Sequence, residues 1–193
     1  MGREYDAIDE RWRDWIARQP LFFVGTAPSG ERGHVNVSPK GPIESLRVLD
    51  PHTVAYLDLV GSGAETIAHL RENGRIVLML CAFAGPPRIV RMHGTGRVVQ
   101  RGDADFEPLA ERFSLPPGVT GGAARRSVVH VDVTRIADSC GYGVPRMHYE
   151  GARPQQPAWV ARKLAQGGPA ALAAYVREHN TTSIDGMPAM EDG

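Results

Sequence analysis

The stretch VAYLDLVGSGAETIAHLRENGRIVLMLCAF, residues 54–83, decides the fold class because its hydrophobic period changes twice. Residues 54–59 and 76–83 are short apolar runs, which are typical of strands. Between them, residues 64–73 predict a helix that begins after a Gly-Ser-Gly turn and ends at an Asn-Gly pair, a common C-terminal signal. The second run is apolar without alternation, which indicates a strand buried on both faces. Residues 54–83 are therefore predicted to form a strand, a turn, a helix and a second strand, in that order.

Four more segments on either side of this stretch have the character of strands: 21–27, 34–38, 89–99 and 128–136. The segment HVNVS alternates, with Val35 and Val37 on one face and polar side chains on the other. The segment IVRMHGTGRVV contains two glycines, which mark a bulge, a bend or a close backbone approach and suit the corner of a barrel. Six short strands at hairpin-like spacing, without long crossover helices, predict a mainly β fold with flanking helices, built on a six-stranded antiparallel barrel.

The expected helices lie mostly outside the barrel. Residues 6–18 predict a helix with two tryptophans on its apolar stripe, and residues 104–113 predict a short one. Pro157 and Pro169 can each open a helix near the end of the chain, and the tail from Asn180 is expected to be loosely held. We therefore divide the chain into three parts: an N-terminal helix on the barrel (1–20), the barrel (21–146) and a C-terminal helical extension (147–193).

Composition excludes several classes of function. The chain has 22 Lys and Arg against 22 Asp and Glu, so it lacks the basic excess of a nucleic-acid-binding protein. No apolar run reaches the ~20 residues that span a bilayer, and the charged N-terminus is unlike a signal peptide, so we expect a soluble cytoplasmic protein. Two cysteines, with histidines outside metal-binding spacings, predict neither a disulfide scaffold nor a metal site. Dinucleotide, P-loop and nucleophile-elbow motifs are also absent from the sequence.

Two segments together predict an anion site. NVSPKG (36–41) is a strand that ends in Lys40, and LVGSGAETIAHL (59–70) is a strand, a glycine turn and a helix start. Backbone N–H groups at the helix start, with the hydroxyls of Ser62 and Thr66, suit a phosphate monoester, and Lys40 supplies the compensating charge. The alternative is structural, with Ser62 as an ordinary helix cap and Lys40 as a solvated loop residue.

A second candidate segment is SCGYGVP, residues 139–145. The glycines around Tyr142 imply an unusual backbone path, so Tyr142 can stack on a ligand ring while Cys140 lines a pocket. The alternative is a turn with a packed tyrosine and a small buried cysteine. Arg88, which opens the fifth strand after a Gly-Pro-Pro turn, can reach a ligand or remain a solvated charge at the hairpin tip.

These segments, in this order, resemble the pyridoxamine 5'-phosphate oxidase-like family of flavin-binding split barrels over about residues 20–146. The resemblance implies a split barrel of the FMN-binding type and a homodimer with FMN in the groove between subunits. It also implies that Lys40 contacts the cofactor phosphate and that Arg88 or Ile89 faces the edge of the flavin ring. Residues at the ring are then Asn36, Val37 and Ser38, and residues completing the phosphate site are Asp58, Ser62 and Thr66.

The chain departs from the family pattern at several positions. Glu65-Thr66 stands where pyridoxamine 5'-phosphate oxidases carry an Arg-Lys pair, and Val35 stands in place of an Arg. The C-terminal segment that grips the substrate phosphate has only Trp159 as a loose match. We therefore expect phosphate binding that is weaker or differently built, and vitamin B6 oxidation is not the expected reaction. Relatives that bind a deazaflavin coenzyme or haem are also known, and single histidines such as His69 and His148 are interpreted as surface residues rather than haem ligands.

The resemblance implies an FMN-dependent oxidoreductase that acts on a small molecule, with the flavin carrying the hydride or electron transfer. No side chain is assigned as catalytic, and the substrate is not specified by the sequence. Three alternatives remain: a non-enzymatic protein that stores or senses FMN, a deazaflavin-dependent reductase, and a dimer scaffold that has lost its cofactor.

Overall fold

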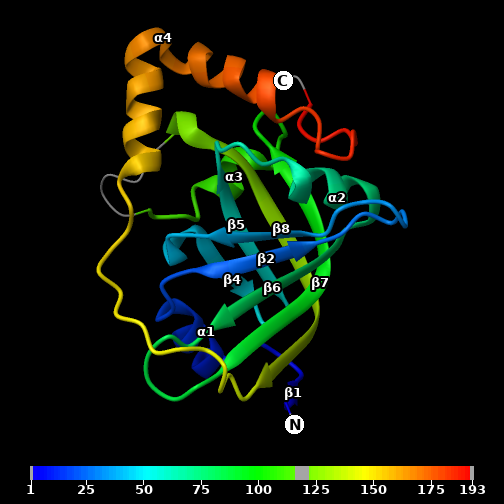
Figure 1. Cartoon of the computed structure of the whole chain (residues 1–193), viewed down its shortest axis with the longest axis vertical. Helices are drawn as coiled ribbons and strands as arrows, with labels where there is room; N and C mark the ends of the chain where they lie inside the picture. Colours follow the sequence, from blue (N-terminus) through cyan, green and yellow to red (C-terminus); the bar gives the residue numbers. More distant parts are fainter. Residues whose placement is uncertain (1, 116–121, 192–193) are drawn as a thin grey trace.

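The computed structural model describes residues 2–115 and 122–191, which form one antiparallel sheet with helices at its two ends (Figure 1). The strand order is β3-β2-β6-β7-β8-β5-β4, and β1 pairs with β8 beside this path. The strands are β1 (Glu4–Tyr5), β2 (Phe22–Thr26), β3 (Asn36–Lys40), β4 (Leu46–Asp50), β5 (Thr53–Leu59), β6 (Arg75–Cys81), β7 (Ile89–Gln100) and β8 (Arg125–Ser139). The mainly β class and the six expected strands are confirmed.

The strand count of six is wrong, because β1 and β4 add two strands. β1 has two residues and becomes a strand only through its pairing with β8. β4 has five residues, includes two charged side chains, and follows a 3-10 helix at Ile43–Ser45. Such short segments carry too few residues to show a period of two.

The sheet curls so that its two edges approach each other. β3 forms one edge, and β5 is next to the other edge, yet the Lys40 ammonium on β3 lies 2.9 Å from a carboxylate oxygen of Asp58 on β5. Alternate side chains of the strands point into the space enclosed and form the main core. Its buried members include Phe22, Tyr56, Leu78, Met92 and Val129.

Helix α1 (Glu10–Ala17) closes one end of the barrel (Figure 1). The Asp9 side chain accepts a hydrogen bond from the backbone N–H of Trp12, so the helix starts later than the predicted residue 6. Trp12 is buried in the main core, as its apolar stripe predicted, and Trp15 is half-buried against it.

Helix α2 (Glu65–Asn73) packs on β2, β6 and β7 and ends where Gly74 takes a left-handed conformation, with φ of 70°. The expected helix with its Asn-Gly end is therefore confirmed. The two strand glycines act as predicted: the β7–β8 register shifts at Gly94, and a Cβ at Gly96 would lie 2.9 Å from a Leu70 methyl group. Glycine thus lets α2 lie directly on β7.

The C-terminal region follows the predicted helices but not the predicted tail. Helix α3 (Phe106–Ala110) is shorter than expected, and α4 (Gln155–His179) consists of two halves separated at Gly167 and Gly168, with Pro169 opening the second half. The tail is not loosely held: Asn180 is buried and donates to the Gly61 carbonyl oxygen at 2.9 Å.

The tail is held by apolar contacts that a local pattern does not reveal. Ala189 and Met190 pack against Ala64 and Ile67 of the α2 region, so the chain end covers this helix. Within the described ranges, no helix has both the length and the apolarity to cross a membrane. The same ranges contain no group of three or more His, Cys, Asp or Glu side chains that could hold a metal ion.

Candidate functional site

Strand β3 turns its polar side chains toward the barrel and its apolar side chains outward. Asn36, Ser38 and Lys40 are half-buried, whereas Val37 is 64% exposed and Val35, just before the strand, is 73% exposed. The predicted alternation of polar and apolar side chains along this segment is confirmed, and the face that carries the valines points to solvent. Among the described residues β3 is an edge strand that pairs with β2 alone, so about half of its backbone N–H and C=O groups have no strand partner there.

A chain of hydrogen bonds joins this polar row to helix α2. The Asn36 amide donates to the Thr66 hydroxyl at 2.9 Å, and the Ser38 hydroxyl donates to the Asn36 amide oxygen at 3.2 Å. The Asn36 amide also lies 3.5 Å from the Thr26 hydroxyl, which in turn lies 2.9 Å from Nδ1 of His69. These contacts fix β3 against α2.

The position of His69 corrects its interpretation as a surface residue, because its side chain is fully buried. Burial lowers the pKa of His69, since the charged imidazolium loses its water. His148 is exposed, as expected. A histidine at this place on α2 therefore supports the fold of the site in its neutral form.

Lys40 is held by a buried carboxylate. Asp58 is 3% exposed and receives the Lys40 ammonium on one oxygen and the Arg126 guanidinium on the other, at 2.9 and 2.6 Å. Burial alone raises the pKa of Asp58, but the charges of Arg126 and Lys40 outweigh it and lower the pKa to about 2. Asp58 is thus a fixed anion between two cations.

Sequence reasoning missed Arg126, which lies near the start of β8 outside any motif. The sequence did contain a signal for a buried ion pair, because Asp58 lies within one apolar strand segment and Arg126 borders another. Charged side chains are rarely buried unless they are paired. β5 and β8 are sheet neighbours, with Asp58 opposite Ser127, so the two opposite charges meet across the strands.

A hollow of about 30 Å³ lies beside this cluster, between β3 and the start of α2. It is large enough for one or two water molecules. At its edge, the Glu65 carboxylate accepts a hydrogen bond from the Ala64 backbone N–H at 3.1 Å and so caps its own helix. The charges of Lys40 and Arg126 are then balanced by those of Asp58 and Glu65.

The glycine turn before α2 is tied to β8 through its carbonyl oxygens. The carbonyl oxygens of Gly61 and Gly63 accept hydrogen bonds from Arg126 at 3.4 and 2.9 Å. Ser62 is exposed, and the N-cap position is taken by Ala64 without a side-chain hydrogen bond. The alternative interpretation of Ser62 as a helix cap is therefore wrong.

The structure brings five of the predicted site residues together and leaves four outside their cluster. The hydrogen-bonded and ion-paired cluster contains Asn36, Ser38, Lys40, Asp58 and Thr66. Val37, Ser62, Arg88 and Tyr142 make no contact with it among the hydrogen bonds and ion pairs of the described residues. Tyr142 is 82% exposed and Cys140 is exposed too, so the alternative of a packed turn with a buried cysteine is wrong.

The sequence pattern of a family described as pyridoxamine 5'-phosphate oxidase matches residues 8–140. The chain belongs to the pyridoxamine 5'-phosphate oxidase family. It is 40% identical to "Pyridoxamine 5'-phosphate oxidase family protein ustO" of Aspergillus flavus over 199 residues, covering 96% of this chain and 77% of that protein.

Solved structures show the same fold. The HupZ protein of Group A Streptococcus is 25% identical, with a TM-score of 0.52, over 67% of this chain and 91% of that chain. A histidine-to-alanine variant of the same HupZ protein is 24% identical, with a TM-score of 0.54, over 68% and 99% of the two chains. The barrel of this pyridoxamine 5'-phosphate oxidase family member is thus a known fold, and the expected split-barrel class is confirmed.

The cluster of this family member fits an anionic group such as the phosphate of a flavin mononucleotide. Lys40 has three N–H donors, of which Asp58 takes one, and the hydroxyls of Ser38 and Thr66 lie at the same hollow. The Glu65 carboxylate competes for this place, but its side chain is only half-buried and can rotate into solvent. The donors present therefore suit a phosphate, and the Glu65 carboxylate is the group that would have to move aside for one.

Proposed function

We propose that this protein is a flavin-dependent oxidoreductase that holds FMN between strand β3 and helix α2. One observation carries the proposal: the inward row of Asn36, Ser38 and Lys40 is tied to Thr66 and Asp58, so donors from β3 and α2 face one hollow beside a buried carboxylate of β5. Membership in the pyridoxamine 5'-phosphate oxidase family supports the same assignment. When bound, the flavin supplies hydride or electron transfer.

In this proposal the chain's own residues bind and orient. Lys40 holds the phosphate as a charge-assisted donor, and Asp58 fixes the direction of its ammonium group. Thr66 accepts from Asn36 and keeps its own O–H to donate, Ser38 can donate once its hydroxyl turns away from the Asn36 amide oxygen, and Asn36 keeps β3 in place against α2. The edge backbone of β3 beside Val37 offers unpaired N–H and C=O groups to the polar rim of the ring.

The site is completed by a second subunit in this proposal. Val35 and Val37 form an apolar strip on the outward face of edge strand β3, where a partner chain can cover both the strip and the flavin. Tyr142, which is exposed and lies outside the cluster of its own chain, is then free to reach the cofactor of the partner. Light scattering of the flavin-loaded protein tests this, and a flavin-loaded monomer contradicts it.

The cluster contains no acid or base suited to neutral pH. Asp58 is kept ionised, since its pKa is lowered to about 2, and His69 is buried away from the hollow. This observation favours one alternative function, a non-enzymatic protein that carries or stores a flavin. Oxidation of NADH or NADPH by the loaded protein separates the two, because only the oxidoreductase turns over.

The first experiment is a visible absorption spectrum of the freshly purified protein, with the released chromophore identified by mass spectrometry. Bound FMN supports the proposal and leads on to the search for reductant and substrate. A deazaflavin or haem keeps the barrel and replaces the cofactor assignment. A colourless protein that does not take up added FMN overturns the proposal and leaves a dimer scaffold.

A further inference from the structure

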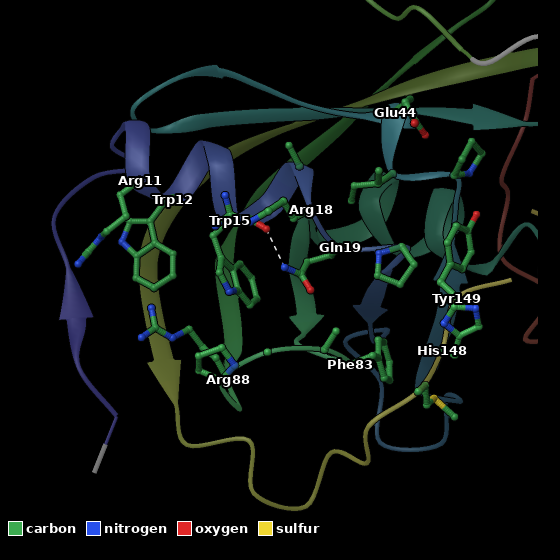
Figure 2. A pocket seen from close by; sticks show the side chains of 18 residues that line it. Arg11, Trp12, Trp15, Arg18, Gln19, Glu44, Phe83, Arg88, His148 and Tyr149 are labelled. Atoms are coloured by element: carbon green, nitrogen blue, oxygen red, sulfur yellow. Dashed lines mark hydrogen bonds between the residues drawn. The ribbon is translucent and has the colours of Figure 1, made fainter. Parts of the chain in front are cut away.

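A larger cavity lies at the other side of the barrel, where α1 meets the loop between β6 and β7 and the segment after β8 (Figure 2). The cavity there measures about 900 Å³, within the range of about 300–1,000 Å³ that small-molecule sites occupy. It shares no lining residue with the hollow beside Lys40. The two sites can therefore be tested separately.

Aromatic side chains from three separate segments line this cavity. Trp15 comes from α1, Phe83 from the loop after β6, and His148 and Tyr149 from the segment that follows the barrel. Figure 2 shows these side chains around a common space, with Gln19 between Trp15 and Phe83. The Gln19 amide is fixed by donating to the Trp15 carbonyl oxygen at 2.7 Å. Flat side chains on several sides suit a ligand ring.

The charged groups at the cavity are mainly positive. Arg11, Arg18 and Arg88 line it, against Glu44 as the acidic lining residue. The Arg88 guanidinium lies 5.2 Å from the centre of the Trp12 ring and 3.9 Å from Asp138, contacts that hold it at the wall. Within residues 2–115 and 122–191, no carboxylate lies within ion-pair distance of Arg11 or Arg18.

We propose that this cavity binds a small aromatic carboxylate. A guanidinium group matches a carboxylate through two parallel N–H donors, and two arginines at the cavity have no carboxylate partner among the described residues. The aromatic walls add stacking contacts that an inorganic anion does not use. A cationic ligand is disfavoured, because three arginines face one glutamate.

Isothermal titration calorimetry tests this with three probes on the protein as purified: indole-3-acetate, its neutral isostere indole-3-acetamide, and acetate. We expect indole-3-acetate to bind at least about tenfold more tightly than the amide, because a charge-assisted hydrogen bond contributes about 1.5–3 kcal/mol and 1.4 kcal/mol is tenfold. Acetate, which has the charge without the ring, is expected to give no measurable heat. Equal affinities for the acid and the amide overturn the proposal.

Variants assign the binding to the arginines. Arg18→Gln alone is expected to weaken indole-3-acetate about tenfold, and the double variant Arg18→Gln with Arg11→Gln about a hundredfold. The matched control is Arg162→Gln, an exposed arginine on α4, which removes the same charge away from the cavity. An unchanged affinity in the double variant rejects the site.

A second double variant keeps the test decisive if the double glutamine variant is less stable than the wild type. Arg18→Lys with Arg11→Lys retains both charges but loses the two parallel donors of each guanidinium. The expected result is a loss of affinity between those of the wild type and the double glutamine variant. Affinity equal to the wild type would show that the planar donor pair is not used, and would overturn the assignment to a carboxylate held by arginine.

Discussion

The cluster beside Lys40 and the cavity beside α1 both contain cationic side chains, but the charges face different surroundings. In the cluster, Lys40 and Arg126 share the buried carboxylate of Asp58, and Glu65 completes the balance around a hollow of about 30 Å³. In the cavity of about 900 Å³, Arg11 and Arg18 are exposed lining residues with no carboxylate partner among the described residues, and the Arg11 guanidinium lies over the Tyr5 and Trp12 rings. A cationic side chain that is paired with a carboxylate of the same chain thus has a mainly structural role. A cationic side chain without such a carboxylate is available to bind a ligand.

The difference in burial makes the two sites unequal in stability as well. Removing one member of a buried ion pair leaves an uncompensated charge in a low-dielectric interior, whereas an exposed arginine remains solvated after any change nearby. Substitutions at the two sites can therefore break or sharpen this contrast, beginning with the largest expected effect.

Asp58→Asn is expected to lower the free energy of unfolding by about 3–5 kcal/mol, because Arg126 stays buried without its carboxylate. Urea denaturation followed by circular dichroism measures this. Arg18→Gln at the cavity is the comparison and is expected to change stability by less than about 0.5 kcal/mol. Equal effects of the two substitutions would remove the distinction between the sites.

Lys40→Ala is expected to weaken FMN binding by about 1.5–3 kcal/mol, or roughly ten- to a hundredfold, through loss of one charge-assisted contact. Fluorescence titration of FMN with the protein measures the dissociation constant. Lys163→Ala is the control, since Lys163 is the other lysine of the chain and lies over Trp159 on α4. An unchanged titration removes Lys40 from the site.

Acid is expected to weaken the cluster in a defined pH range. The pKa of Asp58 is lowered from 3.8 to about 2, so its contribution is present above about pH 4 and is lost as the pH falls toward 2. The shift corresponds to about 2 kcal/mol at 1.36 kcal/mol per pKa unit. Urea midpoints between pH 5 and pH 2 measure it. The difference between wild type and Asp58→Asn must shrink over this range, and a constant difference contradicts the assignment.

Glu65→Gln is expected to tighten FMN binding by about 1 kcal/mol, or roughly fivefold, because it removes a carboxylate from the helix start where the phosphate is proposed to lie. Glu107→Gln in the first turn of α3 is the control. The same fluorescence titration applies, and a weaker complex would show that Glu65 assists binding rather than competing with it.

Much of the fold follows from local patterns in the sequence. The helix end at Asn73-Gly74 and the helix start at Pro169 are local signals, and both were predicted correctly. β1 and β4 were missed because a strand of two or five residues exists through its neighbours rather than its own period. The buried tail was missed for a similar reason, since Ala189 and Met190 are held by α2 and not by adjacent residues.

The candidate site was predictable in part. Lys40 at the end of a strand and Thr66 at the start of a helix are visible in the sequence, and the structure places both at one hollow. Arg126 and Thr26 were not found, because each acts through a partner on a distant segment. The cavity beside α1 was also beyond the sequence, apart from Arg88, because its walls come from segments that lie far apart in the chain.

By itself the sequence determined the mainly β class, the helix that separates β5 from β6, and the polar and apolar alternation of β3. These depend on backbone preferences and on side-chain periods within a few residues. Only the tertiary structure decided that the valine face of β3 points outward, that Lys40 meets Asp58, and that Arg18 remains without a carboxylate within the described residues. The reason is that burial and ion pairing depend on how the sheet curls, which brings together groups that are far apart in the chain.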